Sequence, residues 1–467
     1  MANVLDINKV SNSRIFEVSD FTSIQSAINA AESNGGGLVL LEPKIYIVDE
    51  PLIIDSSGVT LKGMNRNISK IISSANDVEV LRVGSESTSD SGKVQFCKLE
   101  DIGFENTASS TTYCVRVFGS TYFIMRDSSI TRGTTGLVMR NCDMASLENN
   151  LITTDASGAI SVDLQQGASD DITTCKIVGG QINVDGTNGI GLKMTDAPGD
   201  GSSNEFNNLY LGSIKFDGTN TSGTVGIDIE AGTRNTTIQN CEFKEFRAAD
   251  IDASTNLDDG KKVFFTVDSC KMLGNSSNRT LKKIILKEPS ASGSKTKFTM
   301  RGAGTQFHRF VDGIYVSAGS PNIYLEDMDA STGTNLIEVA SGATPAANPN
   351  ITCGDLTIGG SVTNNRGTNL IASSANYAAG IGNAFGSFTL QDEGSVTVNS
   401  GATTASISWS LDFTPNDRDI YIIPDDDDGG DVGEIWLSSV SASGATLNVT
   451  TAPSGSNKTF RYKVKAG

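Results

Sequence analysis

Histidine is almost absent from this sequence: the chain of 467 residues contains only one, His308. A single imidazole excludes His-rich zinc sites and the paired histidines of metalloproteases, and a Ser-His-Asp triad would have to use His308 itself. Because His308 is flanked by Phe307 and by Arg309-Phe310, we interpret it as a packed structural residue. Carboxylates are therefore the main option for acid–base chemistry.

Cysteine, proline and long apolar runs are also scarce. The seven cysteines form no Cys-x-x-Cys motif and are odd in number, which argues against a zinc ribbon or a full disulfide framework and indicates reduced, buried thiols. Ten prolines exclude a proline-rich disordered polymer. No stretch approaches 18 consecutive apolar residues, and the N-terminus shows no secretory signal, so we expect no membrane insertion.

Basic residues are in the minority, with 36 Lys and Arg against 54 Asp and Glu, and the formal net charge is -18. A chain of this charge repels phosphate backbones, which excludes nucleic acid as a primary partner. Gly-x-Gly patterns such as Gly302-Ala303-Gly304 lack the strand-to-helix context of a nucleotide site and are interpreted as turns. We therefore expect no cofactor and no bound metal.

What the sequence does contain is glycine, 49 residues of it, and an internal repeat. A six-residue frame recurs with apolar residues at positions one and usually six and a turn-forming residue at position three. A second short strand, often preceded by glycine, and a third strand complete each period of roughly 25 residues, which is typical of a parallel β-helix. The frames start at Leu61, Leu99, Met125, Leu147, Ile172, Leu211, Ile238, Val267, Met300, Leu325 and Ile351.

The columns of this repeat predict which residues stack on neighbouring coils. Position three is mostly Asp, Asn, Ser or Gly, which tolerate a left-handed bend, so it forms a ladder of turns. Position four includes Cys175, Cys241 and Cys270, which we interpret as small apolar residues stacked inside the coil.

The two ends of the chain differ from the repeat. Ile24, Ala27, Ile28 and Ala31 have helical spacing and predict an amphipathic helix that caps the first coil. After about residue 375 the repeat stops, and six alternating segments predict a small β-sandwich. The expected domains are a leader and capping helix at 1–37, a right-handed parallel β-helix at 38–375 and a sandwich at 385–467.

The opening resembles a known family. The segments Asp20–Ala31, Gly36–Pro43 with Tyr46, and Val59–Gly63 look like the start of the pectate-lyase-like right-handed β-helix proteins that are common among bacteriophage tailspikes, although Lys44-Ile45 replaces the usual glycine. Phe413-Thr414-Pro415 and the last aromatic strand are similar to C-terminal modules of phage tail and fibre proteins. The resemblance implies a homotrimer on a virion, at the tail or capsid surface, that contacts other virion proteins and a host-surface glycan.

Outward side chains of one β-helix column lie about 4.8 Å apart on successive coils. In the second strand this column is predicted to contain Asp228 and Asp252 next to each other, so mutual repulsion raises the pKa of one of them unless a cation intervenes. Such a pair suits a retaining glycosidase, and a solvated acidic face is the alternative. The whole predicted column is Arg82, Arg116, Val138, Ser161, Lys193, Asp228, Asp252, Ile285 and Tyr315.

Two further clusters of acidic residues each allow two interpretations. Asp217 and Glu242, with Lys215, Lys244 and Glu245, occupy consecutive coils and indicate either a salt-bridged surface or a lyase-like site. The run from Asp425 to Asp431 is interpreted as a solvated hairpin loop, with a Ca²⁺ site as the alternative.

Three functions stay open on the sequence alone. The chain attaches a virion to host polysaccharide, or it also depolymerises that polysaccharide, with glycoside hydrolysis favoured over lyase chemistry, or it is a non-enzymatic capsid decoration. Short frames with few long insertions argue against a deep active-site groove, although the insertions near 194–208 and 253–262 could wall a shallow one. The leader, residues 1–19, contains no evident anchoring domain, which keeps the decoration hypothesis open.

Overall fold

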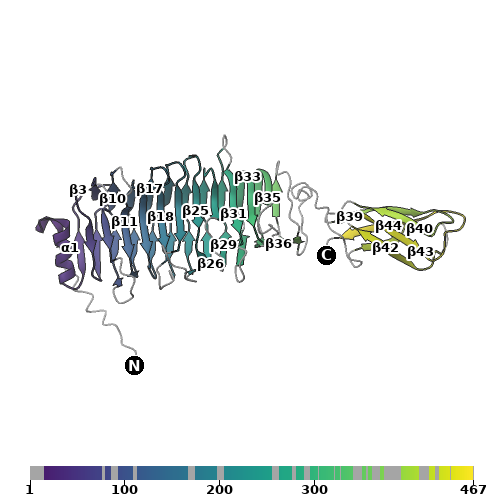
Figure 1. Ribbon diagram of the computed structural model, residues 1–467, viewed down its shortest axis with the longest axis horizontal. Helices are drawn as coiled ribbons and strands as arrows, with labels where there is room; N and C mark the ends of the chain where they lie inside the picture. Colours follow the sequence, from purple (N-terminus) through teal and green to yellow (C-terminus); the bar gives the residue numbers. More distant parts are fainter. Residues whose placement is uncertain are drawn as a thin grey trace, which may run out of the picture.

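The computed structural model describes residues 15–75, 79–85, 93–108, 113–166, 174–196, 205–254, 262–275, 280–288, 295–302, 304–319, 321–326, 328–339, 350–353, 356–359, 369–372, 391–409, 420–425, 431–441 and 443–465. Most of this chain winds into a right-handed parallel β-helix, as the repeat predicts, in which each coil adds one strand to each of three parallel ladders (Figure 1). We call these ladders A, B and C.

Ladder A contains β1 (Ile15–Glu17), β2 (Gly37–Leu40), β5 (Val59–Lys62), β9 (Lys98–Glu100), β13 (Ile124–Arg126), β16 (Ser146–Glu148), β19 (Lys176–Val178), β23 (Tyr210–Gly212), β26 (Gly232–Gln239), β29 (Lys262–Asp268), β32 (Lys295–Arg301), β34 (Asn322–Leu325), β36 (Asn350–Cys353) and β38 (Asn369–Ala372), with β22 (Glu205–Asn207) beside β26.

Ladder B contains β3 (Ile45–Val48), β6 (Lys70–Ser73), β10 (Gly103–Asn106), β14 (Ser129–Thr131), β17 (Leu151–Thr154), β20 (Gln181–Val184), β24 (Lys215–Asp217), β27 (Glu242–Lys244), β30 (Lys271–Leu273), β33 (Thr305–Ala318), β35 (Met328–Val339) and β37 (Leu356–Gly359). The long strands β33 and β35 continue round the corner into ladder C. The rest of ladder C is β4 (Leu52–Ile54), β7 (Leu81–Val83), β11 (Tyr113–Phe118), β15 (Thr135–Arg140), β18 (Ile160–Gln165), β21 (Ile190–Thr195), β25 (Val225–Ile229), β28 (Ala249–Ala253) and β31 (Thr280–Lys287).

The first coil is capped by helix α1 (Ile24–Ser33), which follows a short 3-10 turn, η2 (Val18–Asp20). Ser23 begins the helix with a capping box shared with Ser26, so two otherwise unpaired backbone N–H groups are satisfied. The predicted stripe of Ile24, Ala27, Ile28 and Ala31 is buried, and α1 packs on β1, β2, β4 and β5. The helix therefore covers apolar core that the first coil would otherwise expose.

One continuous hydrophobic core runs from the cap to Ile337, and like side chains stack on like within it. Phe216 and Phe243, for example, lie in adjacent coils with parallel rings and centroids 4.8 Å apart. The predicted turn ladder is present as well, with φ angles of 58°, 50°, 54° and 53° at Asp101, Asp127, Asn149 and Asn240. The backbone N–H of each donates to the next coil, which fixes the register.

Two of the predicted frames are out of register. Ile177, rather than Ile172, aligns with Leu147 and Leu211, and Ile172 lies outside the described residues. Cys353, rather than Ile351, aligns with Leu325, so Cys353 belongs to a strand and not to the turn ladder. In the sixth coil the turn residue is Gly179, whose N–H donates to the carbonyl of Gly212.

The first shift also moves a cysteine. Cys175 comes before β19 and aligns with Cys97 before β9, and not with Cys241 and Cys270. Cys241 and Cys270 do stack, since the N–H of Cys241 lies 3.4 Å from the sulfur of Cys270. Six of the seven cysteines are described as free and buried, and burial raises the pKa of Cys97 to about 11. Their burial makes these thiols packing residues of the core.

Two small units complete the described structure. β8 (Val94–Gln95) pairs with β12 (Ser120–Thr121) just before ladder A. The C-terminal β-sandwich has two antiparallel sheets with a core of its own, including Trp409, Leu447 and Phe460. One sheet is β39 (Gln391–Val398), β44 (Lys458–Lys465) and β41 (Ile420–Pro424), and the other is β40 (Thr404–Ser408), β43 (Gly444–Val449) and β42 (Ile435–Ser441).

The lumen of the β-helix also contains a buried ion pair. Lys283 and Asp250 are both fully buried, with Nζ and Oδ2 3.1 Å apart, and Nζ donates to Oγ1 of Thr280 at 3.0 Å. Burial raises the pKa of Asp250 to about 6 and lowers the pKa of Lys283, while each charge favours the charged form of the other. Each charge is therefore tolerated in the core because its partner is present.

Lys283→Met should accordingly destabilise the protein by about 3–5 kcal/mol, since it leaves a buried carboxyl group unpaired. The double variant Asp250→Ser/Lys283→Met should recover part of that loss. Urea denaturation followed by circular dichroism measures both. A double variant that is no more stable than Lys283→Met would contradict this account of the pair.

Candidate functional site

The outward column of ladder C brings charged side chains of adjacent coils together. Strand pairing aligns Asp163 with Lys193, Lys193 with Asp228, and Asp228 with Asp252. We call these four residues the acidic column. The column continues to Ile285, Tyr315 and Glu338 on one side and to Val138 and Arg116 on the other.

The sequence placed one member of this column wrongly. Val138 aligns with Asp163, whereas Ser161 is fully buried and donates to the carbonyl of Asn183. Two consecutive residues, Ser161 and Val162, face inward where the chain turns the corner into β18, so the strict alternation that selected Ser161 fails there. Asp163 is thus an additional carboxylate that the sequence pattern did not identify.

Asp228 is the most perturbed of these carboxyl groups. The residue is 5% exposed although its side chain lies on the outer face, and its Oδ1 has no hydrogen-bond partner among the described residues. Burial, followed by the negative charges of Glu230 and Asp252, raises the pKa of Asp228 to about 8, and the positive charge of Lys193 only partly offsets this. Asp228 is therefore protonated at neutral pH.

The charges of the residues around Asp228 are balanced by an ion pair or by hydrogen bonds. Lys193 forms an ion pair with Glu230 at 3.1 Å, and Ser254 donates to Oδ1 of Asp252 from its backbone N–H at 2.9 Å and from its hydroxyl at 2.6 Å. Glu230 follows β25 two residues after Asp228, so an alternating pattern extended by one step would have found it. Asp228 thus carries a proton next to carboxylates that have their own partners.

Asp163 lies next to Lys193 in the coil on the side away from Asp228. Its carboxylate accepts from the side chains of Gln165 at 2.7 Å and Thr195 at 3.3 Å. Burial raises the pKa of Asp163, while these two hydrogen bonds and Lys193 lower it. Lys193 therefore lies between carboxyl groups in both neighbouring coils.

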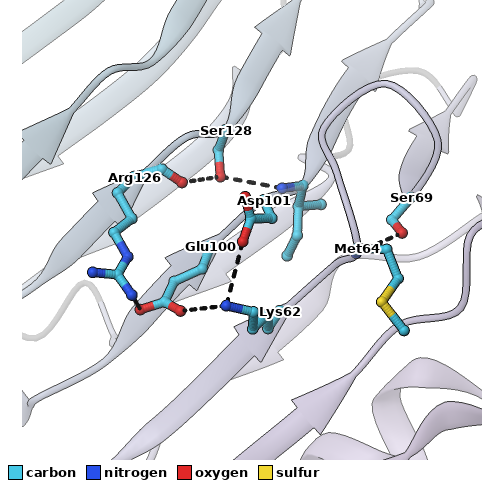
Figure 2. Close-up of polar contacts among 8 residues, drawn as sticks. Lys62, Met64, Ser69, Glu100, Asp101, Arg126 and Ser128 are labelled. Atoms are coloured by element: carbon cyan, nitrogen blue, oxygen red, sulfur yellow. Dashed lines mark hydrogen bonds and ion pairs between the residues drawn. The ribbon is translucent and has the colours of Figure 1, made fainter. Parts of the chain in front are cut away.

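Ladder A shows how charges are arranged where no site is formed. Lys62, Glu100 and Arg126 lie in successive coils, and Glu100 bridges the other two with distances of 3.3 Å to Lys62 and 3.0 Å to Arg126 (Figure 2). Lys62 also reaches Asp101 at 3.3 Å. Signs alternate along this column, so every charge has a neutralising neighbour. The alignment of Asp228 with Asp252 in adjacent coils departs from that arrangement.

Asp217 and Glu242, the other sequence candidates, lie on ladder B and do not join the acidic column. Lys215 aligns with Glu242, and Asp217 aligns with Lys244. The carboxylate of Asp217 is 3.1 Å from Lys215 and 4.0 Å from Lys244, and it accepts from the N–H of Thr219. These contacts favour the salt-bridged surface over the lyase-like site.

Some expected features fall outside the described residues. These include most of the two segments expected to wall a groove, namely 197–204 and 255–261, and residues 426–430 of the acidic loop. At the described edges of that loop, Asp425 pairs with Arg461 at 2.7 Å and Asp431 accepts from the N–H of Gly433. Across the described parts of the chain, no group of three or more metal-ligating side chains is placed to hold a metal ion.

Comparison with known proteins supports the fold. No family model and no curated protein matches the sequence. Among solved structures, the chain is similar to a tailspike protein mutant of E. coli bacteriophage HK620 in complex with a pentasaccharide, at 9% identity and a TM-score of 0.58, covering 98% of this chain and 94% of that one. The likeness confirms the expected resemblance to tailspike-type β-helices.

Two further structures share the fold. ORF18 of Geobacillus virus E2 is 14% identical with a TM-score of 0.50, covering 95% of this chain and 77% of that one. The catalytic domain of a GH87 α-1,3-glucanase in complex with nigerose is 11% identical with a TM-score of 0.55, covering 78% of this chain and 68% of that one.

In the part of the chain that the structure describes, no helix is long and apolar enough to cross a membrane.

The raised pKa of Asp228 predicts how stability depends on pH. The folded protein keeps the Asp228 proton up to about pH 8, whereas the unfolded chain loses it near pH 4. Unfolding therefore releases a proton between these values, and the free energy of unfolding falls as pH rises from about 4 to about 8. Asp228→Asn should remove this slope and stabilise the protein above pH 8 by at most on the order of 5 kcal/mol.

Melting temperatures of both proteins between pH 4 and pH 9 measure the effect. Asp268→Asn is the matched control, because Asp268 is an outward carboxylate on ladder A that pairs with Arg301 at 3.5 Å. If wild type and Asp228→Asn lose stability in parallel as pH rises, the pKa of Asp228 is not raised as described.

Proposed function

We propose that this protein is a spike on a phage virion that binds host-surface polysaccharide and hydrolyses it at the acidic column. The observation that carries the proposal is the buried Asp228, aligned with Asp252 in the adjacent coil, where burial and neighbouring carboxylates raise the pKa of Asp228. A carboxylic acid paired with a carboxylate is what glycosidic bond cleavage requires. The fold likeness to a tailspike that was solved with an oligosaccharide supports the substrate class.

The two residues have different roles. Asp228 donates its proton to the glycosidic oxygen as the bond from the anomeric carbon to that oxygen breaks, and Asp252 attacks that carbon to form a glycosyl ester. Water, deprotonated by the Asp228 carboxylate, then displaces Asp252 and restores the acid. Adjacent strands are about 4.8 Å apart, which fits the carboxyl separation of about 5–5.5 Å in retaining enzymes better than the longer separation in inverting ones.

Hydrolysis fits this site better than lyase chemistry. A lyase needs an unprotonated base next to a uronate carboxyl group, and cations to bind that carboxyl. Lys193 is the described cation in the acidic column, and it is paired with Glu230 at 3.1 Å. Asp163, Glu230 and Asp252 would repel a polyuronate, so we propose a polysaccharide with neutral sugars at the cleaved bond.

The assembly belongs to the same proposal. We infer that the spike is a homotrimer located on the virion and held there by contacts with other virion proteins, as the resemblance to tailspikes implies. One chain has a mass of 49.0 kDa. Light scattering of the purified full chain should therefore give three times that mass. A monomer at micromolar concentration would contradict the trimer.

Activity is tested by incubating the protein with bacterial capsular polysaccharide and lipopolysaccharide and measuring new reducing ends. Asp228→Asn should lower kcat by about 10²–10⁴-fold, the usual contribution of a general acid, and Asp252→Asn should abolish turnover. Because the acid must stay protonated, wild-type activity should fall above about pH 8, where Asp228 ionises.

Asp268→Asn on ladder A again serves as the control and should leave activity unchanged. If Asp217→Asn abolishes cleavage and Asp228→Asn does not, the catalytic site is on ladder B. Glycan binding without product would remove the enzyme claim and leave attachment. Absence of glycan binding, together with capsids that lose stability when the protein is deleted, would favour the decoration hypothesis.

A further inference from the structure

Two aromatic rings are stacked on the outside of the β-helix. Phe96 and Tyr122 lie at the corner before ladder A in adjacent coils, with ring centroids 4.9 Å apart and planes within 2° of parallel. The residues are 53% and 41% exposed, and Met144 in the next coil is 45% exposed. Phe216 and Phe243 form the same kind of stack inside the core, where burial of apolar surface explains it. Burial does not explain the stack of Phe96 and Tyr122, because both rings are exposed on the outside of the β-helix.

The backbone at this corner makes the choice of residues more unusual. Phe96, Tyr122 and Met144 have φ angles of 57°, 61° and 50°, in the left-handed region that bulky side chains avoid. The same position in the following coils is Thr174, Asn208 and Asn235, also at positive φ. Asparagine fits this conformation with less strain and exposes no apolar surface. Strained backbone that presents exposed rings is a mark of a binding function.

The stack ends at a glycine. The register of β5 and β9, extended by two residues, places Gly58 beside Phe96, and the N–H of Gly58 donates to the carbonyl of Gln95. Gly58 shares the left-handed conformation with a φ of 80°. Because parallel rings in adjacent coils have their faces directed along the coil axis, one face of Phe96 lies on Tyr122 and the other is turned toward Gly58. A Cβ built on Gly58 would meet Gly35 O at 3.5 Å, an ordinary contact. The position of the next ring in the stack is therefore open.

Polar groups surround this open position. Ser57 and Gln95 are exposed, and the hydroxyl of Ser57 accepts from the N–H of Gln95 at 2.9 Å. On the side of helix α1, Oε1 of Glu32 accepts from the N–H groups of Asp55 at 2.6 Å and Ser56 at 2.9 Å. One flat apolar face bordered by hydroxyl, amide and carboxylate groups suits a ligand with an apolar ring face and polar edges.

We propose that the exposed face of Phe96 binds a sugar ring of the host polysaccharide, which takes the place of the missing ring above Gly58. The C–H groups on one face of a pyranose pack on an aromatic face, while its hydroxyls can reach Ser57, Gln95 and Glu32. This inference rests on the proposed function for the ligand class. The site lies four coils from Asp228, about 19 Å along the axis at the strand spacing, and so holds the glycan at a second place.

The test measures binding of the full-length protein to immobilised bacterial lipopolysaccharide and capsular polysaccharide by biolayer interferometry. Phe96→Ala removes the platform, and Gly58→Tyr fills the open position with the protein's own ring. Each should raise Kd at least tenfold. Gly58→Asn, which tolerates positive φ but supplies no ring, should bind within twofold of wild type. So should Tyr324→Ala, which removes another exposed tyrosine, 39% exposed on ladder A.

Asp268→Asn on ladder A, which lies in neither proposed site, should bind like wild type. If wild type binds glycan and both Phe96→Ala and Gly58→Tyr bind equally well, the inference is wrong and the proposed function stands. If wild type binds none of the polysaccharides, both are wrong. A lower mass of Phe96→Ala in light scattering would show that the stack contacts a second copy of the chain instead. Should Gly58→Tyr melt early, Phe96→Ala decides the test alone.

Discussion

The spacing of about 4.8 Å between coils is the constraint on which the rest of this structure depends. It places each side chain directly against its counterparts in the coils before and after, so every position of the repeat becomes a column. Inside the helix this favours identical apolar residues, as in the stacked rings of Phe216 and Phe243. Outside it favours alternating charge, as in Lys62, Glu100 and Arg126. A column that breaks either rule is unstable unless something else compensates, and such columns are where function is to be sought.

Both candidate sites are exceptions of this kind. Asp228 next to Asp252 puts two acids where ladder A would put opposite charges, and the strain is relieved by a proton retained up to about pH 8. Phe96 above Gly58 leaves an apolar face in water and a bulky residue at a positive φ of 57°. In the first case the compensation is chemical and gives an acid. In the second it would come from a ligand. The buried pair of Asp250 and Lys283 breaks the apolar rule of the lumen, and there each charge compensates the other.

The sequence predicted the fold well because each position of the repeat corresponds to one column of stacked side chains. Residues such as Leu99, Met125 and Leu147 aligned as expected, and the capping helix buries the stripe that its spacing indicates. The sequence pattern assigned some residues to the wrong position of the repeat, and it did so where the chain turns from one ladder to the next. Ile172 and Ile177 are both apolar, and only strand pairing shows which one continues the ladder. Strict alternation places Ser161 in the outward column, but two inward residues in succession, Ser161 and Val162, interrupt that alternation. The sequence does not predict the stack at Phe96, since phenylalanine and tyrosine give no signal for a left-handed turn.

Charge finally limits which polysaccharide can use the proposed site. Burial, followed by the negative charges of Glu230 and Asp252, raises the pKa of Asp228 and keeps its proton in place, and Lys193 only partly opposes this. A cationic or uronate-binding groove would lower the pKa of Asp228 and remove the acid. In the proposed site, the same acidity that retains the proton selects against anionic sugars. In such a site, affinity has to come from uncharged contacts, and an aromatic face such as that of Phe96 provides one without disturbing the carboxyl groups.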